Sequence, residues 1–161
     1  MAALGKTIVM FHTNLFHNTY QKVKQGNITG REDRKMSVIE PKGELTLRTL
    51  AMPADVNVNG DIFGGWLVSQ MDLAGGIAAA RVAKGRVATV AIDKMSFMVP
   101  LKVGAIVSCY THVVATGRSS VEVAIEVWAC YSDDVEKTKV TEGMFIFVGI
   151  NDKGRTRAID A

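Results

Sequence analysis

Alternation of apolar and polar residues is the main pattern along this chain, and it predicts five strands. The stretches rich in β-branched and aromatic residues are 44–50, 88–99, 106–116, 119–131 and 140–150. In the fourth stretch, four β-branched residues alternate with small or charged ones, Glu122 and Glu126 among them. We therefore expect this strand to belong to a sheet that is buried on one face and open to solvent on the other.

One stretch, residues 63–84, lacks this alternation and predicts a helix. It consists mostly of Ala, Leu, Met, Gln and Val with almost no charge, and it ends at Lys84 and Gly85. A cation in the last turn and a glycine after it are typical helix stops. The predicted helix has about six turns. Because apolar residues occur nearly all round it, we expect it to be buried by the strands.

The order of these elements indicates the fold class. One strand precedes the helix and four follow it, with turn-forming residues at 53–60 and predicted hairpin connections at Gly117-Arg118 and 132–138. This order favours an α+β domain in which an antiparallel sheet curls around one central helix. The chain has 161 residues, which suits one domain with a substantial core.

The first 35 residues differ from the rest, since no regular period runs through them. They lack the basic start, long apolar centre and cleavage site of a secretory signal. We interpret residues 1–35 as a flexible or artefactual extension, with translation beginning at Met36. An organelle-targeting leader is the alternative. The domain itself is expected to span residues 36–161.

Composition excludes several classes of protein. The net charge is only +3 and no Lys/Arg block occurs, so nucleic-acid binding is not expected. Cys109 and Cys130 lie singly in alternating stretches rather than in the close pairs of a zinc site, so no metal is expected. No apolar run approaches the ~20 residues that span a bilayer. We therefore expect a cytoplasmic protein that does not bind membranes.

Asp72 is the first candidate for chemistry, because it is the only acid between Phe63 and Lys84. An isolated carboxylate in an apolar helix requires either a raised pKa or a bonding partner. Carboxylates in such apolar surroundings often take part in catalysis. From the residues alone, Asp72 is equally consistent with an exposed stripe beside Ser69 and Gln70, or with a structural ion pair.

The pair Gly64-Gly65 at the predicted helix start is the second candidate. Free amides at a helix start attract negative charge, so this pair is a candidate oxyanion hole, although it is also consistent with a tight turn. Gly64 and Asp72 are eight residues apart, which is ~12 Å along a helix. Both can act on one substrate only if one of them comes from a neighbouring copy, so a site between subunits is expected.

The run MPADVNVNGDIFGGWLVSQMDLAGG at 52–76 closely resembles the signature of the YciA-type acyl-CoA thioester hydrolases of the hotdog-fold superfamily. The likeness continues through GRVATV, FMVP, VGAIV, GRSS, IEVW and GRTRAI, and covers about residues 43–159. The resemblance implies a five-stranded antiparallel sheet around one long helix. It also implies a homodimer as the minimal unit and commonly a trimer of dimers.

The resemblance further implies which residues act. The family's catalytic carboxylate falls on Asp72, and the asparagine that works with it from the opposing subunit falls on Asn57. The Gly64-Gly65 backbone falls beside the thioester. Without the resemblance, we would interpret Asn57 as an ordinary turn-forming residue. The implied activity is hydrolysis of acyl-CoA to a carboxylic acid and CoA without a cofactor, and a non-catalytic acyl-CoA sensor is the alternative.

Binding of the CoA moiety is expected at a second group of residues. Arg118, Ser119 and Ser120 form a basic corner suited to phosphate, and Arg86 is a further candidate, as are Arg155 and Arg157. An ordinary hairpin with a solvated arginine is the alternative. Two mechanisms remain open for Asp72, general-base activation of water or direct attack to form an anhydride.

Overall fold

The strands and the helix follow the order that the sequence predicts. The computed structural model describes residues 40–132 and 137–159, so the prediction about residues 1–35 lies outside the described residues. The elements are β1 (Glu44–Leu50), the 3-10 turn η1 (Pro53–Asp55), α2 (Gly64–Ala83), β2 (Val87–Phe97), β3 (Ile106–Thr116), β4 (Ser120–Cys130) and β5 (Thr138–Gly149). The predicted ends of the strands and helix differ from these by no more than two residues.

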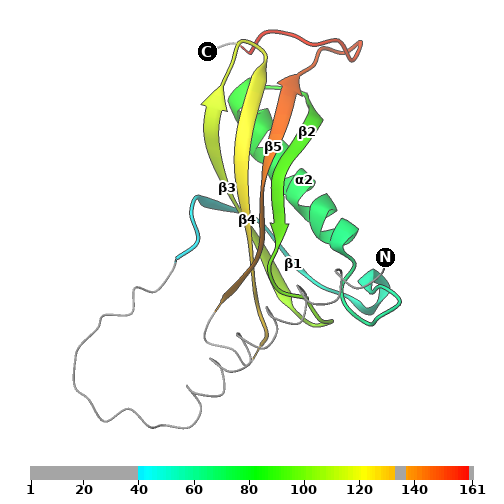
Figure 1. The fold of residues 1–161 in the computed structure, drawn as a ribbon. Coiled ribbons are helices and arrows are strands. Elements are labelled where there is room, and N and C mark those ends of the chain that lie inside the picture. Colours follow the sequence, from blue (N-terminus) through cyan, green and yellow to red (C-terminus); the bar gives the residue numbers. More distant parts are fainter. Residues whose placement is uncertain (1–39, 133–136, 160–161) are drawn as a thin grey trace, which may run out of the picture. The chain divides into compact units, whose positions relative to one another are not determined.

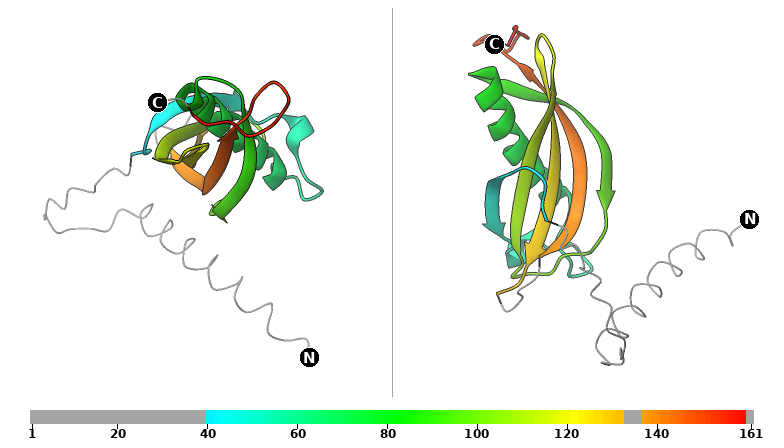
Figure 2. Two further views of the ribbon diagram at one scale, coloured as in Figure 1. Left: turned by 90° about the horizontal axis from the view of Figure 1, so that it is seen from above. Right: turned by 90° about the vertical axis from the view of Figure 1, so that its left-hand side faces the viewer.

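The strands form one antiparallel sheet in the order β1-β3-β4-β5-β2. The sheet curves around α2, which lies against its concave face (Figures 1 and 2). The predicted connection at Gly117-Arg118 joins β3 to β4 as a tight turn. The predicted α+β class is therefore confirmed, and β1 and β2 are left as the two edge strands.

Small residues let α2 lie close to the sheet. Its buried residues are Leu67, Met71, Ala74, Gly75, Ala78, Ala79 and Ala83. A Cβ atom at Gly75 would lie 2.8 Å from the Phe147 ring and from the terminal methyl group of Ile125, closer than side-chain atoms pack. Glycine is needed at this position because the helix backbone reaches the core side chains of β4 and β5.

The prediction that α2 is buried all round is wrong for a single chain. Leu73 and Ile77 are 55% and 41% exposed. One curved sheet can cover only one face of a helix, so the opposite face has no neighbour among the described residues. Val90 and Ile92 on the adjacent edge strand β2 are also exposed. An apolar face of the helix and an apolar edge of the sheet are therefore both exposed to solvent. Exposed apolar surface of this kind is typical of an interface between subunits.

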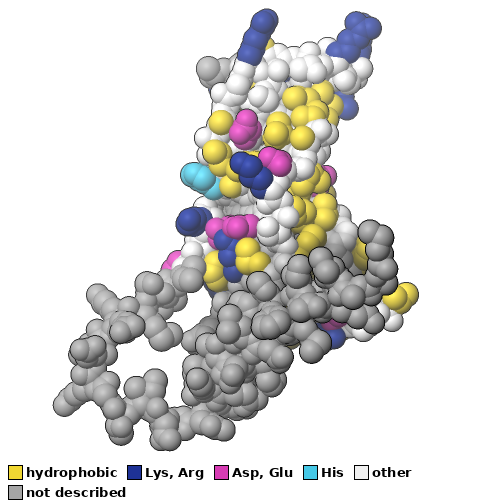
Figure 3. Space-filling model, viewed as in Figure 1, with side chains coloured by type: hydrophobic (Ala, Val, Ile, Leu, Met, Phe, Trp, Pro, Cys, Tyr) yellow, Lys and Arg dark blue, Asp and Glu magenta, His cyan; other side chains and the backbone are white. Residues whose placement is uncertain are grey.

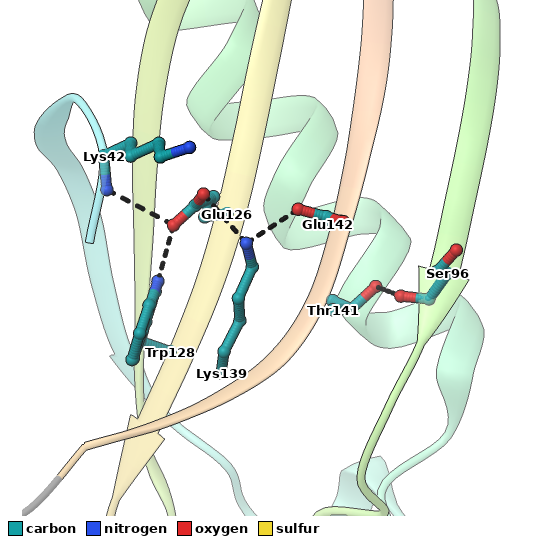
Figure 4. Close-up of polar contacts among 7 residues, drawn as sticks. All are labelled: Lys42, Ser96, Glu126, Trp128, Lys139, Thr141 and Glu142. Atoms are coloured by element: carbon teal, nitrogen blue, oxygen red, sulfur yellow. Dashed lines mark hydrogen bonds and ion pairs between the residues drawn. The ribbon is translucent and has the colours of Figure 1, made fainter. Parts of the chain in front are cut away.

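The convex face of the sheet is not simply solvated, contrary to the prediction for Glu126. Figure 3 shows charged side chains in the middle of this face and hydrophobic ones on the side of β2 and β5. The Glu126 side chain is only 12% exposed and accepts hydrogen bonds from Lys139 Nζ at 2.8 Å and Trp128 Nε1 at 2.9 Å (Figure 4). The backbone amide of Lys42 is a third donor, at 3.2 Å. The bulk of Trp128 and the Lys139 stem shelter the carboxylate from water.

This network sets the charge states of its members. Desolvation opposes ionisation of Glu126, but hydrogen bonds from Lys139, Trp128 and Lys42 outweigh it and hold the pKa of Glu126 below its usual value. Desolvation likewise opposes the charge of Lys139. Its bonds to Glu126 and to Glu142, at 2.7 Å from Nζ, nevertheless raise the pKa of Lys139. The cluster therefore stays ionised and fixes β4 to β5.

Candidate active site

Asp72 lies in the middle of α2 and has a partner on the edge strand. Thr89 of β2 donates a hydrogen bond from Oγ1 to Asp72 Oδ1 at 2.6 Å. Of the two alternatives expected for this carboxylate, a raised pKa or a bonding partner, the structure shows a bonding partner. The sequence does not reveal that Thr89 is the partner, because no local spacing relates a helix residue to a strand residue across a turn. Among the described residues, none bonds the second oxygen of this half-buried carboxylate, which is therefore available to a ligand.

A groove of about 520 Å³ begins at this pair. One wall is α2 between Asp72 and Ala80, and the other is the start of β2 with Thr89. Arg86, just before β2, also lines the groove. The groove thus brings together a carboxylate, a hydroxyl group and a guanidinium group along an apolar wall that includes Ile77. Such an arrangement suits a long ligand with an anionic end.

Gly64 and Gly65 begin α2, as predicted. Among the described residues, no acceptor contacts their amides, so both N–H groups are available to a ligand. Neither residue lines the Asp72 groove. Eight residues of helix separate Gly64 from Asp72, ~12 Å along the axis. A single chain does not bring this pair and the carboxylate together.

Asn57 serves as a turn former in the single chain. Its Oδ1 accepts the backbone amides of Asn59 at 2.8 Å and Asp61 at 3.2 Å, which closes the loop before α2. Asn57 does not line the Asp72 groove. Val58 beside it is fully exposed at the loop tip. An exposed apolar tip on a tightly bonded loop is suited to contact another copy.

The residues predicted to bind CoA gather at one end of the domain. The β3–β4 turn with Arg118 and Ser119 lies at the same end as the last turn of α2 and the C-terminal segment (Figures 1 and 2). Arg118 is exposed and Ser120 is half-buried at the start of β4. The structure places Arg86, but not Arg118, on the groove.

Arg155 and Arg157, the two further candidates for binding the CoA phosphates, have different surroundings in the structure. Arg155 is exposed, whereas Arg157 is half-buried and donates from Nη2 to the Ala83 carbonyl oxygen at 2.6 Å. Arg157 therefore bonds the carbonyl group of the last residue of α2. Its guanidinium group is engaged within the chain, which is a different use from the phosphate contact that we expected.

Other reactive side chains do not contribute to this groove. Cys109 is buried, and burial raises the pKa of its thiol to about 12, so it remains protonated at neutral pH. Within 40–132 and 137–159, no cluster of His, Cys, Asp or Glu is placed to hold a metal ion. In the same residues, no helix is long and apolar enough to cross a bilayer.

Comparison with known sequences shows the family. The family model described as "Thioesterase superfamily" matches residues 59–130. The acyl-CoA thioester hydrolase YciA of Escherichia coli strain K12 is 49% identical over 122 residues, which cover 74% of this chain and 92% of that protein. Such identity over nearly the whole relative is far above what a shared fold alone requires.

Solved structures agree with this relationship. A hexameric thioesterase from Yersinia pestis is 49% identical with a TM-score of 0.72, covering 76% of this chain and 99% of that one. A hexameric hotdog-fold thioesterase of Campylobacter jejuni is 40% identical with a TM-score of 0.70, covering 73% and 91%. A hexameric broad-specificity acyl-coenzyme A thioesterase, solved as an aspartate-to-alanine mutant, is 48% identical with a TM-score of 0.72, covering 74% and 88%.

The curved five-stranded sheet around one helix is thus the hotdog fold, in the form used by thioesterases. Within that class, the chain belongs to the family of YciA acyl-CoA thioester hydrolases. Both the fold and the family that the 52–76 run predicts are confirmed.

Proposed function

We propose that this protein hydrolyses acyl-CoA thioesters to a carboxylic acid and free CoA, with Asp72 as the catalytic carboxylate. The observation that carries the proposal is the position of Asp72 at the start of the groove, held through one oxygen by Thr89. A carboxylate with one fixed oxygen is oriented but still able to take a proton. The names of the relatives support acyl-CoA as the substrate class.

The site is completed by a second copy of the chain. The exposed face of α2 with Leu73 and Ile77, together with the edge of β2, provides an apolar surface for that copy. We propose that pairing through this surface brings Asn57, Gly64 and Gly65 of the partner subunit near Asp72. We propose a homodimer as the minimal active unit and, because the similar solved structures are hexameric, a trimer of dimers.

In the mechanism that we favour, Asp72 acts as a general base. It removes a proton from water as the water oxygen attacks the thioester carbonyl carbon. Backbone amides at Gly64 and Gly65 of the partner subunit stabilise the oxyanion, at ~3 kcal/mol per donor. Asn57 of the partner subunit orients the water or the carbonyl group. The C–S bond then breaks, and the proton on Asp72 passes to the leaving sulfur.

Direct attack by Asp72 on the carbonyl carbon is the second route. It forms an acyl anhydride and expels the CoA thiolate, and water then cleaves the anhydride. Single-turnover hydrolysis in water labelled with heavy oxygen distinguishes the two routes. Label in the Asp72 side chain would contradict the pure general-base route.

The CoA moiety is proposed to run from Asp72 toward the basic end of the domain. Arg86 lines that end of the groove, and Arg118, Ser119 and Ser120 lie at the same end of the sheet. Arginine side chains bind phosphate groups through paired donors. The acyl chain would then extend in the other direction, into the interface between copies.

A thiol-release assay with a panel of acyl-CoAs tests the proposal on the wild type and on Asp72→Asn. We expect turnover by the wild type and loss of turnover by the variant. Tight binding without turnover by the wild type would instead identify a non-catalytic acyl-CoA sensor and overturn the proposal.

Subunit complementation tests the shared site. Asp72→Asn and Asn57→Ala chains are each expected to be nearly inactive alone. After unfolding and joint refolding, half of the dimers are mixed and carry one intact site, so about a quarter of the wild-type activity returns. If both residues act from the same copy, mixing restores nothing.

A further inference from the structure

The C-terminal segment folds back onto the end of α2. Ile150 and Thr156 form a β-bridge, and Asn151 Oδ1 accepts the amides of Lys153 and Arg155 at 3.0 Å each. This bonded turn reverses the chain after β5. It directs Arg157 toward the last residues of α2.

Residues 157–159 connect this segment to three parts of the domain, and Arg157 makes two of the contacts. Its backbone amide donates to the Gly149 carbonyl oxygen at 2.8 Å, at the end of β5. Its guanidinium donates from Nη2 to the Ala83 carbonyl oxygen at 2.6 Å, at the end of α2. Two residues later, the Ile159 amide donates to the Arg118 carbonyl oxygen at 2.8 Å in the β3–β4 turn. One short segment thus holds the end of α2, β5 and the Arg118 turn together.

The local chemistry explains why an arginine lies here. The last carbonyl groups of a helix lack partners within the helix and carry the negative end of its dipole. Lys84 ends α2 in the left-handed conformation, with φ 48°. A Cβ at the next residue, Gly85, would lie 2.6 Å from Arg157 Nη2. Glycine at 85 therefore leaves the space that the guanidinium group occupies.

The turn that Arg157 holds leads directly to the groove. Gly85 is followed by Arg86, which lines the groove, and then by β2. The Arg86 carbonyl oxygen accepts the Ile150 amide at 2.9 Å. Within the described part of the chain, the guanidinium of Arg86 has only long contacts, 3.4 Å to the Asn151 carbonyl oxygen and 3.9 Å to Asp152. Its backbone is fixed, while its side chain remains available to a ligand.

We propose that Arg157 is a positioning residue for recognition of the CoA nucleotide. It does not contact the substrate. Its guanidinium group anchors residues 157–159 to the end of α2, close in sequence to Arg86, and the Ile159 amide of the same residues bonds the Arg118 turn. The Arg86 and Arg118 segments are thereby held at a fixed separation, so that both side chains reach the phosphate groups together. This inference rests on the proposed function. It predicts that loss of Arg157 weakens recognition of the nucleotide and leaves the thioester chemistry unchanged.

Two substrates separate these effects, an acyl-CoA and the matching acyl-pantetheine, which lacks the nucleotide. For Arg157→Ala we expect the KM for acyl-CoA to rise about tenfold while kcat stays the same. For acyl-pantetheine we expect changes in both constants below about twofold. Equal effects on the two substrates, or no effect on either, would overturn the proposal.

Further variants test whether an effect of Arg157→Ala comes from misfolding or merely from the loss of a positive charge. Gly85→Ala keeps every charge but displaces the guanidinium group, and we expect the KM for acyl-CoA to rise in the same direction. Arg157→Lys keeps the charge and one donor, and should fall between wild type and Arg157→Ala. Lys153→Ala removes a charge from the same segment and should change KM by less than about twofold. A rise for Lys153→Ala equal to that for Arg157→Ala would contradict positioning.

Calorimetric titration with CoA and with pantetheine needs no turnover. If the wild type hydrolyses neither thioester, the proposed function is wrong. The inference is then still tested by whether Arg157→Ala weakens binding of CoA but not of pantetheine. Unchanged affinity for CoA would refute it in either case.

Discussion

Two carboxylates of this domain lie on opposite faces of the same sheet and differ in how they are bonded. Glu126 on the convex face accepts three donors, among them Lys139 and Trp128, and is nearly enclosed. Asp72, on the helix against the concave face, accepts one hydroxyl group from Thr89 and lines an open groove. Both residues are half-buried as a whole, so the burial of the residue does not by itself distinguish them.

The two carboxylates differ in the number of hydrogen-bond donors that they accept and in how accessible they are to a ligand. A carboxylate surrounded by donors is locked in its charged form and contributes to stability. A carboxylate with one donor is oriented by it and keeps an oxygen for a ligand or a proton. The surroundings of Glu126 are complete within one chain, whereas those of Asp72 end in exposed apolar residues, Leu73 and Ile77. The contrast predicts a structural role for Glu126 and a catalytic role for Asp72.

The largest expected effect is that of Asp72→Asn on catalysis. We expect kcat to fall by a factor of about 10² to 10⁴, because the variant cannot take a proton. The free energy of unfolding should change by less than about 0.5 kcal/mol, since an amide oxygen still accepts the Thr89 hydroxyl. Thiol-release kinetics and urea unfolding measure the two quantities. A variant as active as the wild type would remove Asp72 from the mechanism.

Glu126→Gln should show the opposite behaviour. Loss of the charge weakens the bonds from Lys139 and Trp128, and we expect about 2 kcal/mol lower stability in urea unfolding, with kcat unchanged. Glu122→Gln is the matched control on the same strand. It has no ion pair within the described part of the chain, so its effect should stay within about 0.5 kcal/mol. Equal effects of the two variants would contradict a special role for the Glu126 network.

Thr89→Val tests whether the single donor matters to Asp72. We expect kcat to fall about tenfold, the equivalent of one hydrogen bond to a charged group, with KM nearly unchanged. Thr89→Ser retains the hydroxyl group and should stay close to wild type. If valine and serine lower kcat equally, the shape of the strand and not the hydrogen bond is responsible.

The smallest expected effect is the pH dependence of stability. The pKa of Glu126 is lowered on folding, so its contribution is complete above the unfolded value of ~4.3 and is lost as pH falls through the folded pKa. The pKa of Lys139 is raised, so its contribution is complete below ~10.4 and is lost as pH rises through the folded pKa. The stability gap between wild type and Glu126→Gln should therefore be constant near neutral pH and narrow in acid. A gap that widens in acid would contradict these directions.

Most of the fold is predictable because it depends on local patterns. Alternation over a few residues defines each strand, and the uncharged run before Lys84 and Gly85 defines the helix and its end. The run at 52–76 identifies the family and predicts Asp72 as the catalytic carboxylate. The N-terminal position of Gly64 in the helix follows from the same run.

The amino-acid sequence is therefore sufficient to predict the elements, their order, the family and the catalytic candidate. The three-dimensional fold is needed to see that Thr89 bonds Asp72, that Glu126 is enclosed and that Arg157 bonds the end of α2. Each of these contacts joins residues from different elements. Their geometry depends on the curvature of the sheet and on how closely α2 lies against it, whereas a local pattern records only the face on which a residue lies.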